Sequence, residues 1–358
     1  MQNAAYQFQL GGAPISCEPY GRGHINETYI IKTDAGRPYI LQRINGRVFH
    51  DIPGLMGNVA RVTRYLAEID PDPRHALTLI PAAGGGDYWQ DDDGGIWRVY
   101  HYISNSICLQ AAENAEDFRQ SGVAFGRFQR LLSGFPAETL AETIPRFHDT
   151  PYRFEQFKRA MAEDAAGRAR QVAEEIGLSL SYEKEAGGLM EMLREGRLPL
   201  RVAHNDTKLN NVLLDADTRE PLCVVDLDTI MPGLAANDFG DSIRFGASTA
   251  AEDEADLDMV MLSLPYFEAY TKGFLSECGG NLTDGEVASL PLGAKLMTLE
   301  CGVRFLADYL NGDQYFRVAR PGHNLDRART QLKLVAEMER NWERLCDIVE
   351  RTRGSVRG

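Results

Sequence analysis

The chain has 358 residues, 44% of them hydrophobic and 25% charged, which is ordinary for a globular protein large enough to form two lobes. Its net charge of −14 argues against a nucleic-acid partner, because phosphate backbones are bound by basic clusters and none runs long here. No window approaches the roughly 18 apolar residues of a membrane span, and no signal peptide is visible, so we expect no membrane partner. Six scattered cysteines without a C-x-x-C pair indicate reduced thiols and a cytoplasmic protein.

The first hundred residues predict a strand-rich lobe. Runs of β-branched and aromatic residues, separated by glycine-containing turns, predict strands at 6–8, 15–17, 28–31, 39–42, 78–80 and 96–100. Apolar residues with helical spacing predict one helix over 55–69. We expect residues 1–103 to form an N-terminal lobe that binds nucleotide.

The remaining residues, 104–358, predict a mainly helical lobe. Apolar periodicity predicts helices at 118–132, 154–176, 259–273, 290–310 and 325–349, and only a hairpin at about 200–226 interrupts them. We expect this lobe to carry catalysis and substrate binding. The two parts together predict an α+β protein with a β-rich N-lobe and a mainly helical C-lobe.

A glycine-rich segment at 20–29 lies between two predicted strands. Gly21 and Gly23 allow the backbone to approach an anion closely, so the segment is a candidate cover for nucleotide phosphates. His24 and Asn26 are candidates for hydrogen bonds to a substrate. A tight hairpin with a polar tip explains the same residues equally well.

The stretch HNDTKLNN at 204–211, followed by Asp226 at the end of an apolar run, is the most informative motif. Asp206 and Asn211 have the D-x-x-x-x-N spacing of a kinase catalytic loop. In phosphoryl transfer the first carboxylate accepts the proton of the attacking hydroxyl, while the amide and the second carboxylate hold magnesium. The spacing alone can arise by chance, but the predicted hairpin from Asn211 to Asp226 gives the parts in the right order. We expect Asp206 to be the catalytic base and Asn211 and Asp226 to be Mg²⁺ ligands in a small-molecule kinase that uses ATP.

With this loop the chain resembles the aminoglycoside phosphotransferase/choline kinase-like superfamily, and more closely the N-acetylhexosamine 1-kinases. The resemblance covers nearly the whole chain and rests on GHINETY (23–29), LQRIN (41–45), AFGRFQ (124–129), FHDT (147–150), HNDTK (204–208), VDLDTIMPG (225–233), DFGDSIRFG (238–246) and RFLADYL (304–310). The catalytic-loop spacing is common to the superfamily, whereas the HNDTK and DLDT-MPG forms are much narrower. The resemblance implies a bilobal protein-kinase-like fold.

The resemblance also implies an activity: phosphorylation, with ATP and Mg²⁺, of the anomeric C1 hydroxyl of N-acetylglucosamine or N-acetylgalactosamine in amino-sugar salvage. It implies sugar contacts by His24, Arg43, Arg304 and Tyr315. Structural explanations compete for two of them. Arg304 has acidic residues four positions away on either side of it on the predicted helix, and Tyr315 follows a helix stop where it could anchor a loop.

The resemblance includes one departure from the wider superfamily, in which a lysine on the third strand holds the α- and β-phosphates. The matching positions here are Gln42 and Arg43, and the alternation of a strand turns only one of them inward. If Gln42 faces the nucleotide, magnesium and backbone amides hold the phosphates; if Arg43 does, its guanidinium pairs with them. Glu68, the obvious acidic residue on the predicted helix, lies near the helix end.

Four further residues near these motifs have structural interpretations. We expect His204 to bond backbone in the catalytic loop, and His148 to pack or to help cap the next helix. Asp228 is a candidate second shell for the metal site, and Asp238 either holds the catalytic loop or caps a helix.

Two other functions compete with the sugar 1-kinase. One is a kinase for another sugar, an amino alcohol or an aminoglycoside, which the acidic charge would suit. The other is a nucleotide-binding pseudokinase, against which the intact Asp206, Asn211 and Asp226 argue. A protein kinase fits less well, since the D-F-G at 238–240 comes after Asp226 and no A-P-E-like segment follows.

Overall fold

The computed structural model describes residues 2–21 and 25–357. The chain divides into two compact units. The first contains Met1–Cys108, Gly134–Pro145 and Val212–Pro232, and the second contains Leu109–Ser133, Arg146–Asn211 and Gly233–Gly358. Two segments from later in the sequence therefore belong to the first unit. The division at residue 103 stays a prediction.

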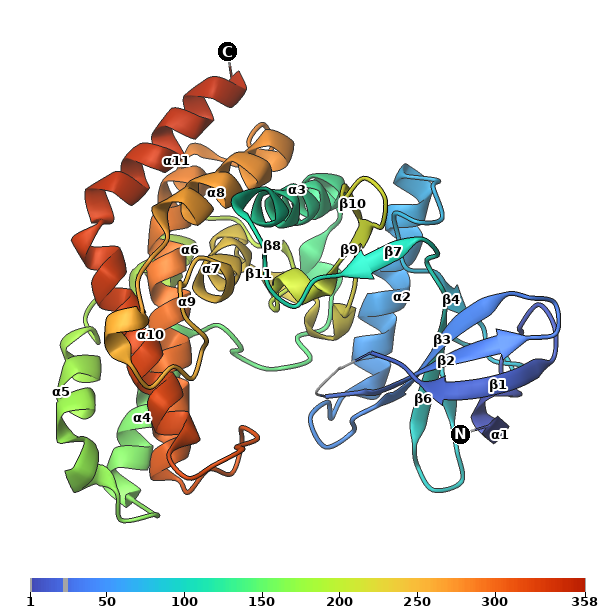
Figure 1. The fold of residues 1–358 in the computed structure, drawn as a ribbon, viewed down its shortest axis with the longest axis horizontal. Helices are drawn as coiled ribbons and strands as arrows, with labels where there is room; N and C mark the ends of the chain where they lie inside the picture. Colours follow the sequence, from blue (N-terminus) through green and yellow to red (C-terminus); the bar gives the residue numbers. More distant parts are fainter. Residues whose placement is uncertain (1, 22–24, 358) are drawn as a thin grey trace. The chain divides into compact units, whose positions relative to one another are not determined.

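An antiparallel sheet forms the centre of the first unit (Figure 1). Its strand order is β1-β2-β3-β6-β4, with β5 paired to β6. The strands are β1 (Pro14–Pro19), β2 (Glu27–Thr33), β3 (Pro38–Ile44), β4 (Leu79–Ile80), β5 (Trp89–Gln90) and β6 (Ile96–His101). Alternate side chains such as Ile31, Leu41 and Val99 are fully buried, so the period-2 pattern builds one apolar face.

The predicted strand at 6–8 is wrong. The chain instead forms a short helix, α1 (Gln2–Ala5), and Phe8 makes only an isolated bridge to Ala82. Ala4, Ala5 and Phe8 are buried in the same apolar cluster as the sheet. These residues therefore reach the core from a helical turn and the bridge that follows it.

The helix α2 (Ile52–Ile69) confirms the predicted helix and begins three residues earlier than expected. Asp51 caps it by accepting a hydrogen bond from the Gly54 N–H, and a proline in the first turn needs no N–H partner. The buried Asn58 side chain donates to the carbonyl oxygens of Ala141 (2.8 Å) and Ile230 (2.9 Å). One polar residue therefore ties α2 to both of the inserted segments.

A second sheet in the first unit has the order β10-β9-β7 and confirms the predicted hairpin. Its strands are β7 (Ser106–Cys108), β9 (Val212–Asp215) and β10 (Pro221–Val224). A 3₁₀ turn, η5 (Leu227–Thr229), follows β10, and another, η2 (Ala137–Thr139), lies in the inserted segment. β11 (Met231–Gly233) ends this part of the chain.

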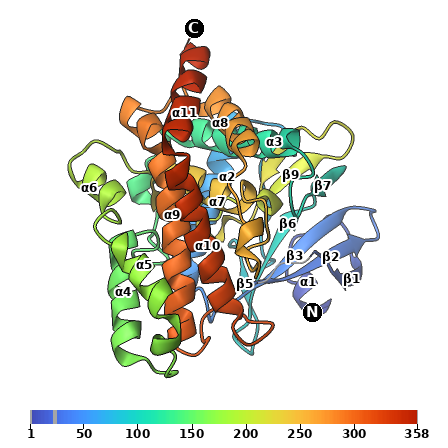
Figure 2. The same ribbon diagram turned by 60° about the vertical axis from the view of Figure 1, so that its left-hand side comes forward.

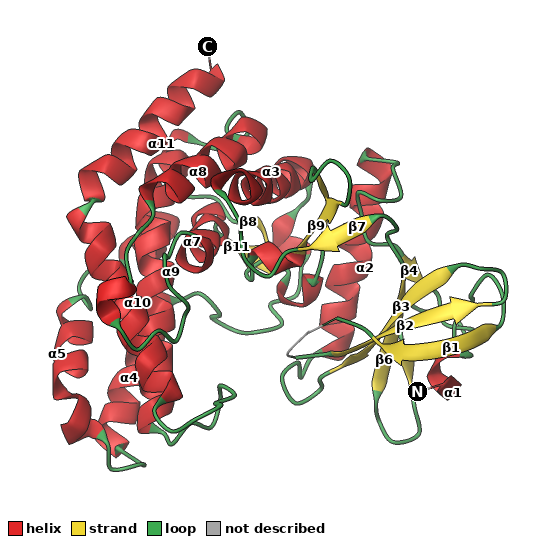
Figure 3. Ribbon diagram, in the orientation of Figure 1, coloured by secondary structure: helices red, strands yellow, loops and turns green. Residues whose placement is uncertain are grey.

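Helices make up most of the second unit (red in Figure 3). They are α3 (Ala115–Leu131), α4 (Thr150–Glu163), α5 (Ala173–Ser181), α6 (Gly188–Arg194), α7 (Ala235–Gly246), α8 (Leu264–Cys278), α9 (Asp284–Leu310), α10 (His323–Arg340) and α11 (Trp342–Arg357). The other elements are β8 (Arg201–Ala203) and the 3₁₀ turns η1 (Leu132–Gly134), η3 (Ala169–Val172), η4 (Leu209–Asn211) and η6 (Leu257–Met259).

The long helix α9 is central to the second unit, packing against α4, α7 and α10; α9 and α10 run side by side in both views (Figures 1 and 2). Glycines set how closely α7 and α9 approach. A Cβ at Gly240 would collide with the backbone of Gly293, and one at Gly293 would collide with the backbone of Ala236. The α7–α9 contact is therefore a backbone-to-backbone packing that larger residues would open.

Two predicted helices are each divided in the structure. The expected helix at 154–176 ends at Asp164, whose left-handed backbone (φ 38°) and side chain, which accepts from the N–H groups of Arg168 and Ala169, turn the chain. The expected helix at 325–349 is divided at Asn341 into α10 and α11. The apolar periodicity continues across both breaks, so periodicity alone did not find them.

The antiparallel sheet of the first unit and the helical second unit confirm the predicted α+β fold class. None of the helices in the part of the chain that the structure describes is both long and apolar enough to cross a membrane.

Candidate active site

The predicted catalytic loop, residues 204–208, connects β8 to η4 in the second unit and is held by Asp238 of α7. The Asp238 carboxylate accepts hydrogen bonds from the N–H groups of His204 (2.9 Å) and Asn205 (2.8 Å) and from the side-chain amide of Gln129 on α3 (2.8 Å). Burial raises the pKa of Asp238, while the charge of His204 and the N–H donors act in the opposite direction. Of the two interpretations of Asp238, the structure selects the one in which it holds the loop.

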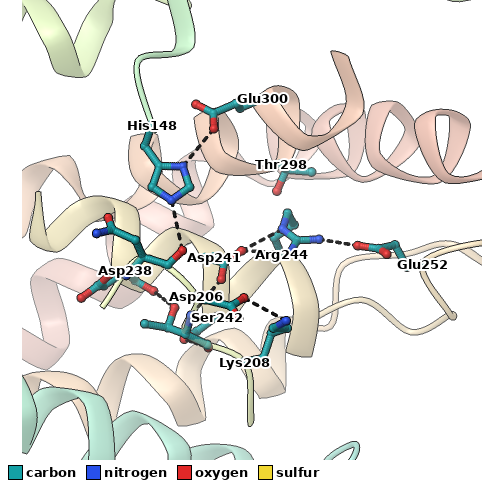
Figure 4. A network of polar contacts seen from close by, with 12 residues as sticks. His148, Asp206, Lys208, Asp238, Asp241, Ser242, Arg244, Glu252, Thr298 and Glu300 are labelled. Atoms are coloured by element: carbon teal, nitrogen blue, oxygen red, sulfur yellow. Dashed lines mark hydrogen bonds and ion pairs between the residues drawn. The ribbon is translucent and has the colours of Figure 1, made fainter. Parts of the chain in front are cut away.

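A second carboxylate of α7, Asp241, fixes the next turn of the loop (Figure 4). It accepts from the Thr207 N–H (2.9 Å) and pairs with Arg244 (2.9 Å), which also pairs with Glu252 (2.6 Å). Ser242 donates to the Thr207 carbonyl (2.6 Å). Burial acts to raise the pKa of Asp241, but the charges of Arg244, Lys208 and His148 and the hydrogen bond from Arg244 together outweigh it, and the pKa is lowered. The loop therefore rests on polar contacts to two consecutive turns of α7.

Asp206 lies on this loop with three groups around it. The Asn211 amide donates to the Asp206 carbonyl (2.8 Å) and carboxylate (3.2 Å), and the Lys208 ammonium lies 2.9 Å from the other carboxylate oxygen. The Asp206 N–H donates to His204 Nδ1 (3.3 Å), so His204 bonds backbone as expected. With a side chain 26% exposed, Asp206 is oriented by neighbours yet open to a ligand. This is the arrangement that a positioned general base needs.

His148 connects the catalytic loop to α9 (Figure 4). Its Nε2 lies 3.2 Å from the Asn205 carbonyl and its Nδ1 lies 2.9 Å from the Glu300 carboxylate. The imidazole therefore lies between a backbone carbonyl of the loop and a buried carboxylate of α9. Burial acts to raise the pKa of Glu300, but the charge and hydrogen bond of His148 outweigh it and lower the pKa. The helix cap that was expected here is supplied by the neighbouring Asp149.

Arg304, one turn beyond Glu300 on α9, lies among aromatic rings. Its guanidinium carbon is 5.5 Å from the Phe147 ring centre, 5.8 Å from Tyr315 and 5.5 Å from Phe316. Glu300 and Asp308, the acidic residues four positions on either side, are bonded to other groups: Glu300 to His148, and Asp308 to the backbone N–H groups of residues 314–316. Tyr315 is 66% exposed. Two of the predicted sugar contacts, Arg304 and Tyr315, are therefore neighbours.

A cavity of about 660 Å³, including its part open to solvent, lies in the first unit. Asp226 lines it from the end of β10, together with side chains of the main sheet and the chain that follows β6. They include Tyr20, Thr28, Ile40, Gln42, Arg98, Tyr100, Tyr102 and Leu213.

Of the two third-strand candidates, Gln42 lines the cavity, where its amide donates to Thr28 (3.2 Å). Arg43 is not among the lining residues described; it lies 3.7 Å from Glu27 and over the Trp97 ring. The predicted contact of Arg43 with substrate stays a prediction. Gly21 follows β1 with φ 77°, a conformation that favours glycine. Gly23 and His24 lie outside the described residues.

Comparison with known sequences assigns the family. The sequence model of the APH phosphotransferase enzyme family matches residues 16–269. The chain belongs to this family.

Solved structures show the same fold at low sequence identity. An amicoumacin kinase, in complex with AMP-PNP, Ca²⁺ and Ami, has a TM-score of 0.62 and 17% identity, covering 92% of this chain and 91% of that one. A microcompartment-associated aminopropanol kinase has a TM-score of 0.58 and 17% identity, covering 96% and 97%. An aminoglycoside phosphotransferase from Alicyclobacillus acidocaldarius has a TM-score of 0.57 and 13% identity, covering 100% and 96%. These neighbours confirm the predicted protein-kinase-like fold.

Asn211 and Asp226 stay the predicted Mg²⁺ ligands, and each carries an oxygen donor of the kind that Mg²⁺ binds. The Asn211 amide nitrogen bonds Asp206, which leaves the amide oxygen as its donor to a metal, and Asp226 supplies a carboxylate. Within the described ranges, no three His, Cys, Asp or Glu side chains form a metal cluster. Mg²⁺ is commonly held by one or two protein oxygens together with phosphates and water, so a sparse oxygen set suits it. Asn211 belongs to the second unit and Asp226 to the first.

Lys208 belongs to the HNDTK motif, but the sequence alone predicted no role for it. The structure puts its ammonium on the Asp206 carboxylate. The available signal was a cation two residues after the proposed base, on the same loop. Arg98, buried in the cavity of the first unit, was missed entirely.

Proposed function

We propose that this phosphotransferase uses ATP and Mg²⁺ to phosphorylate the anomeric C1 hydroxyl of N-acetylglucosamine or N-acetylgalactosamine, giving the sugar 1-phosphate for amino-sugar salvage. The observation that carries the chemistry is the geometry of Asp206: a partly exposed carboxylate on a loop pinned by Asp238 and flanked by Asn211. The choice of an N-acetylhexosamine is supported by the narrow HNDTK and DLDT-MPG sequences.

In this proposal Asp206 accepts the proton of the attacking hydroxyl. An anomeric hydroxyl is more acidic than an ordinary alcohol, so a carboxylate of ordinary basicity suffices. Asn211 and Asp226 hold Mg²⁺, which when bound neutralises charge on the phosphates. Lys208 keeps the Asp206 carboxylate oriented and adds positive charge beside the site of transfer.

We assign the sugar to the side of the catalytic loop that carries Arg304 and Tyr315. Aromatic rings pack well against the apolar face of a pyranose, and the Arg304 guanidinium, already stacked on three rings, offers N–H donors to hydroxyl or acetamido oxygens. His148 joins this cluster to the catalytic loop through Glu300 and Asn205. His24 stays a predicted sugar contact.

The test is turnover with Mg²⁺ and ATP on N-acetylglucosamine, N-acetylgalactosamine, glucose, choline and kanamycin, with phosphorus NMR of the product. We expect a sugar 1-phosphate from the acetylated sugars. Asp206→Asn should lower turnover by several orders of magnitude because base and positioning effects combine. Asp92→Asn, the same change at an exposed turn, is the matched control. Asp206→Asn activity above about a tenth of wild type would remove Asp206 as the base.

A kinase for a cationic substrate is the second candidate, favoured by the net charge of −14 and by neighbours named for amicoumacin, aminopropanol and aminoglycosides. Turnover on choline or kanamycin without turnover on acetylated sugars would select it. Nucleotide binding with silence across the panel would select a pseudokinase. We place the protein in the cytoplasm, where its six free cysteines would stay reduced.

A further inference from the structure

A buried arginine occupies the centre of the cavity wall in the first unit. Arg98, on β6, is 1% exposed and stands directly opposite Gln42 in the register of β3 and β6. Its Nε and Nη2 donate to the Gln42 side-chain oxygen (3.0 and 2.8 Å), and its Nη1 lies 2.5 Å from the Asp228 carboxylate. A wholly buried guanidinium at the edge of a cavity is costly unless it serves a specific partner.

The ion pair of Arg98 and Asp228 lies on different elements from the lysine–glutamate pair that kinases usually have. Kinases hold the nucleotide phosphates with a third-strand lysine, which pairs with a glutamate on the following helix. Here the third strand presents Gln42, and the neighbouring helix α2 presents Met56, whose sulfur is 3.9 Å from Arg98 Nη1. Glu68 of α2 is exposed. The cation here is Arg98, on the neighbouring strand β6, and its acidic partner is Asp228 of η5.

Asp228 is itself held in place. The Asn26 side-chain nitrogen donates to its second carboxylate oxygen (2.5 Å), and the Asn26 side-chain oxygen accepts from the Asn45 N–H (3.0 Å). The ion pair with Arg98 is therefore fixed from the strand side and from the turn that follows β10. Burial acts to lower the pKa of Arg98, but the charges of Asp228 and Asp226 raise it above its usual value, so the guanidinium stays charged.

The guanidinium keeps a donor for a further acceptor. Gln42 takes two of its five N–H groups, and Nη1 forms the ion pair with Asp228 and lies beside the weak acceptor Met56, which leaves the second N–H of Nη2 for a further acceptor. Among the described residues that line the cavity, Arg98 is the one permanent cation. It shares this wall with Asp226, the predicted magnesium ligand.

We propose that Arg98 is the phosphate-binding cation of the nucleotide site, with Asp228 as its positioning partner. The proposal rests on the proposed function, because it takes the cavity that Asp226 lines to be the ATP site of that kinase. It also answers how the site holds phosphates when Gln42 stands at the lysine position.

The experiment measures binding of ATP and of adenosine by titration calorimetry, with Mg²⁺ and without sugar, so that no turnover is needed. Arg98→Met removes the charge, and Arg98→Met/Asp228→Asn removes both members of the buried pair so that no lone carboxylate disturbs folding. Lys32→Met, at an exposed position of β2, is the matched control. Thermal unfolding of each variant shows whether it is folded.

We expect the double variant to bind adenosine as wild type does and to bind ATP about ten- to a hundredfold more weakly, the factor carried by one charge-assisted hydrogen bond. Arg98→Lys should recover part of the loss. Equal affinity for ATP in the double variant and wild type, or equal losses for ATP and adenosine, would show that Arg98 only supports the fold. Wild-type protein that binds neither ligand would overturn the nucleotide assignment of the cavity, and the proposal with it.

Discussion

Asp308 provides a quantitative test of the sugar site, because it holds the segment that carries Tyr315. One oxygen of its buried carboxylate accepts from the N–H groups of Gln314 (2.9 Å) and Tyr315 (2.8 Å). The other accepts from the Phe316 N–H (2.9 Å) and the Asn324 amide (2.9 Å). In Asp308→Asn an NH₂ group replaces one carboxylate oxygen. This group only donates, so it cannot accept hydrogen bonds from the two donors that it faces.

The variant loses two hydrogen bonds to a charged acceptor, each contributing about 1.5–3 kcal/mol, so the segment loses about 3–6 kcal/mol of local stability. The apparent affinity for a ligand falls with the fraction of protein in the binding arrangement. We therefore expect the sugar KM of Asp308→Asn to rise at least about tenfold, since each 1.4 kcal/mol is a factor of ten. The ATP KM should stay unchanged, because no contact of Asp308 belongs to the cavity of the first unit.

Steady-state kinetics with each substrate varied in turn measures both constants, and thermal unfolding reports folding. Asp347→Asn, on an exposed position of α11, makes the same chemical change away from the segment. A variant that is folded, with an altered melting temperature and an unchanged sugar KM, would refute the assignment of the Tyr315 segment to the sugar. Parallel increases of both KM values would refute the local character of the effect.

Three further predictions concern the buried charges around the catalytic loop. Asp238→Asn should lower kcat while changing KM little, because the two loop N–H groups lose a charged acceptor; an unchanged kcat in folded protein would contradict this. His148→Ala should lower the free energy of unfolding in urea by about 3–5 kcal/mol because it removes the ion-pair partner of the buried Glu300 carboxylate, and His148→Ala/Glu300→Gln should regain part of that, which a purely steric role of His148 would not allow. The lowered pKa values of Asp241 and Glu300 mean that their stabilisation is complete above about pH 4 and is lost as the pH falls through the lower folded values; a melting temperature that does not fall below pH 4 would oppose this.

The sequence predicted the parts of the site that are local in the chain. Asp206 and Asn211 lie five residues apart, on the loop and in η4, and Asp226 follows the next hairpin, so spacing and strand pattern predicted where they lie in the secondary structure. Their roles as base and Mg²⁺ ligands stay predictions. Asp238 was left open between two interpretations, since only the packing of α7 shows that its carboxylate meets the loop backbone. A local sequence pattern does not show which distant residues a side chain will contact.

Arg98 shows the same limit in the first unit. It contacts Gln42, 56 residues earlier in the chain, because β3 and β6 are neighbours in the sheet. The amino-acid pattern of a single strand does not show which other strand it will pair with. The alternation of β3 predicted that only one of Gln42 and Arg43 faces inward, but not which. In a kinase-like sheet, a search for the missing lysine should therefore include the strand paired with the third one.

The letters D-F-G at 238–240 show why position in the fold, more than motif, decides a role. In a protein kinase the aspartate of this motif holds magnesium, whereas here the motif lies inside α7 and its three residues have structural tasks. Asp238 holds the catalytic loop, Phe239 is fully buried, and Gly240 lets α7 pack on the backbone of Gly293 in α9. The same α9 carries Arg304 and, through Glu300 and His148, reaches the loop a second time. The loop of the proposed base is thus connected to α9, which carries the proposed sugar-binding arginine, in two independent ways. Two connections hold the base and the arginine rigidly, and positioning a hydroxyl for transfer requires such rigidity.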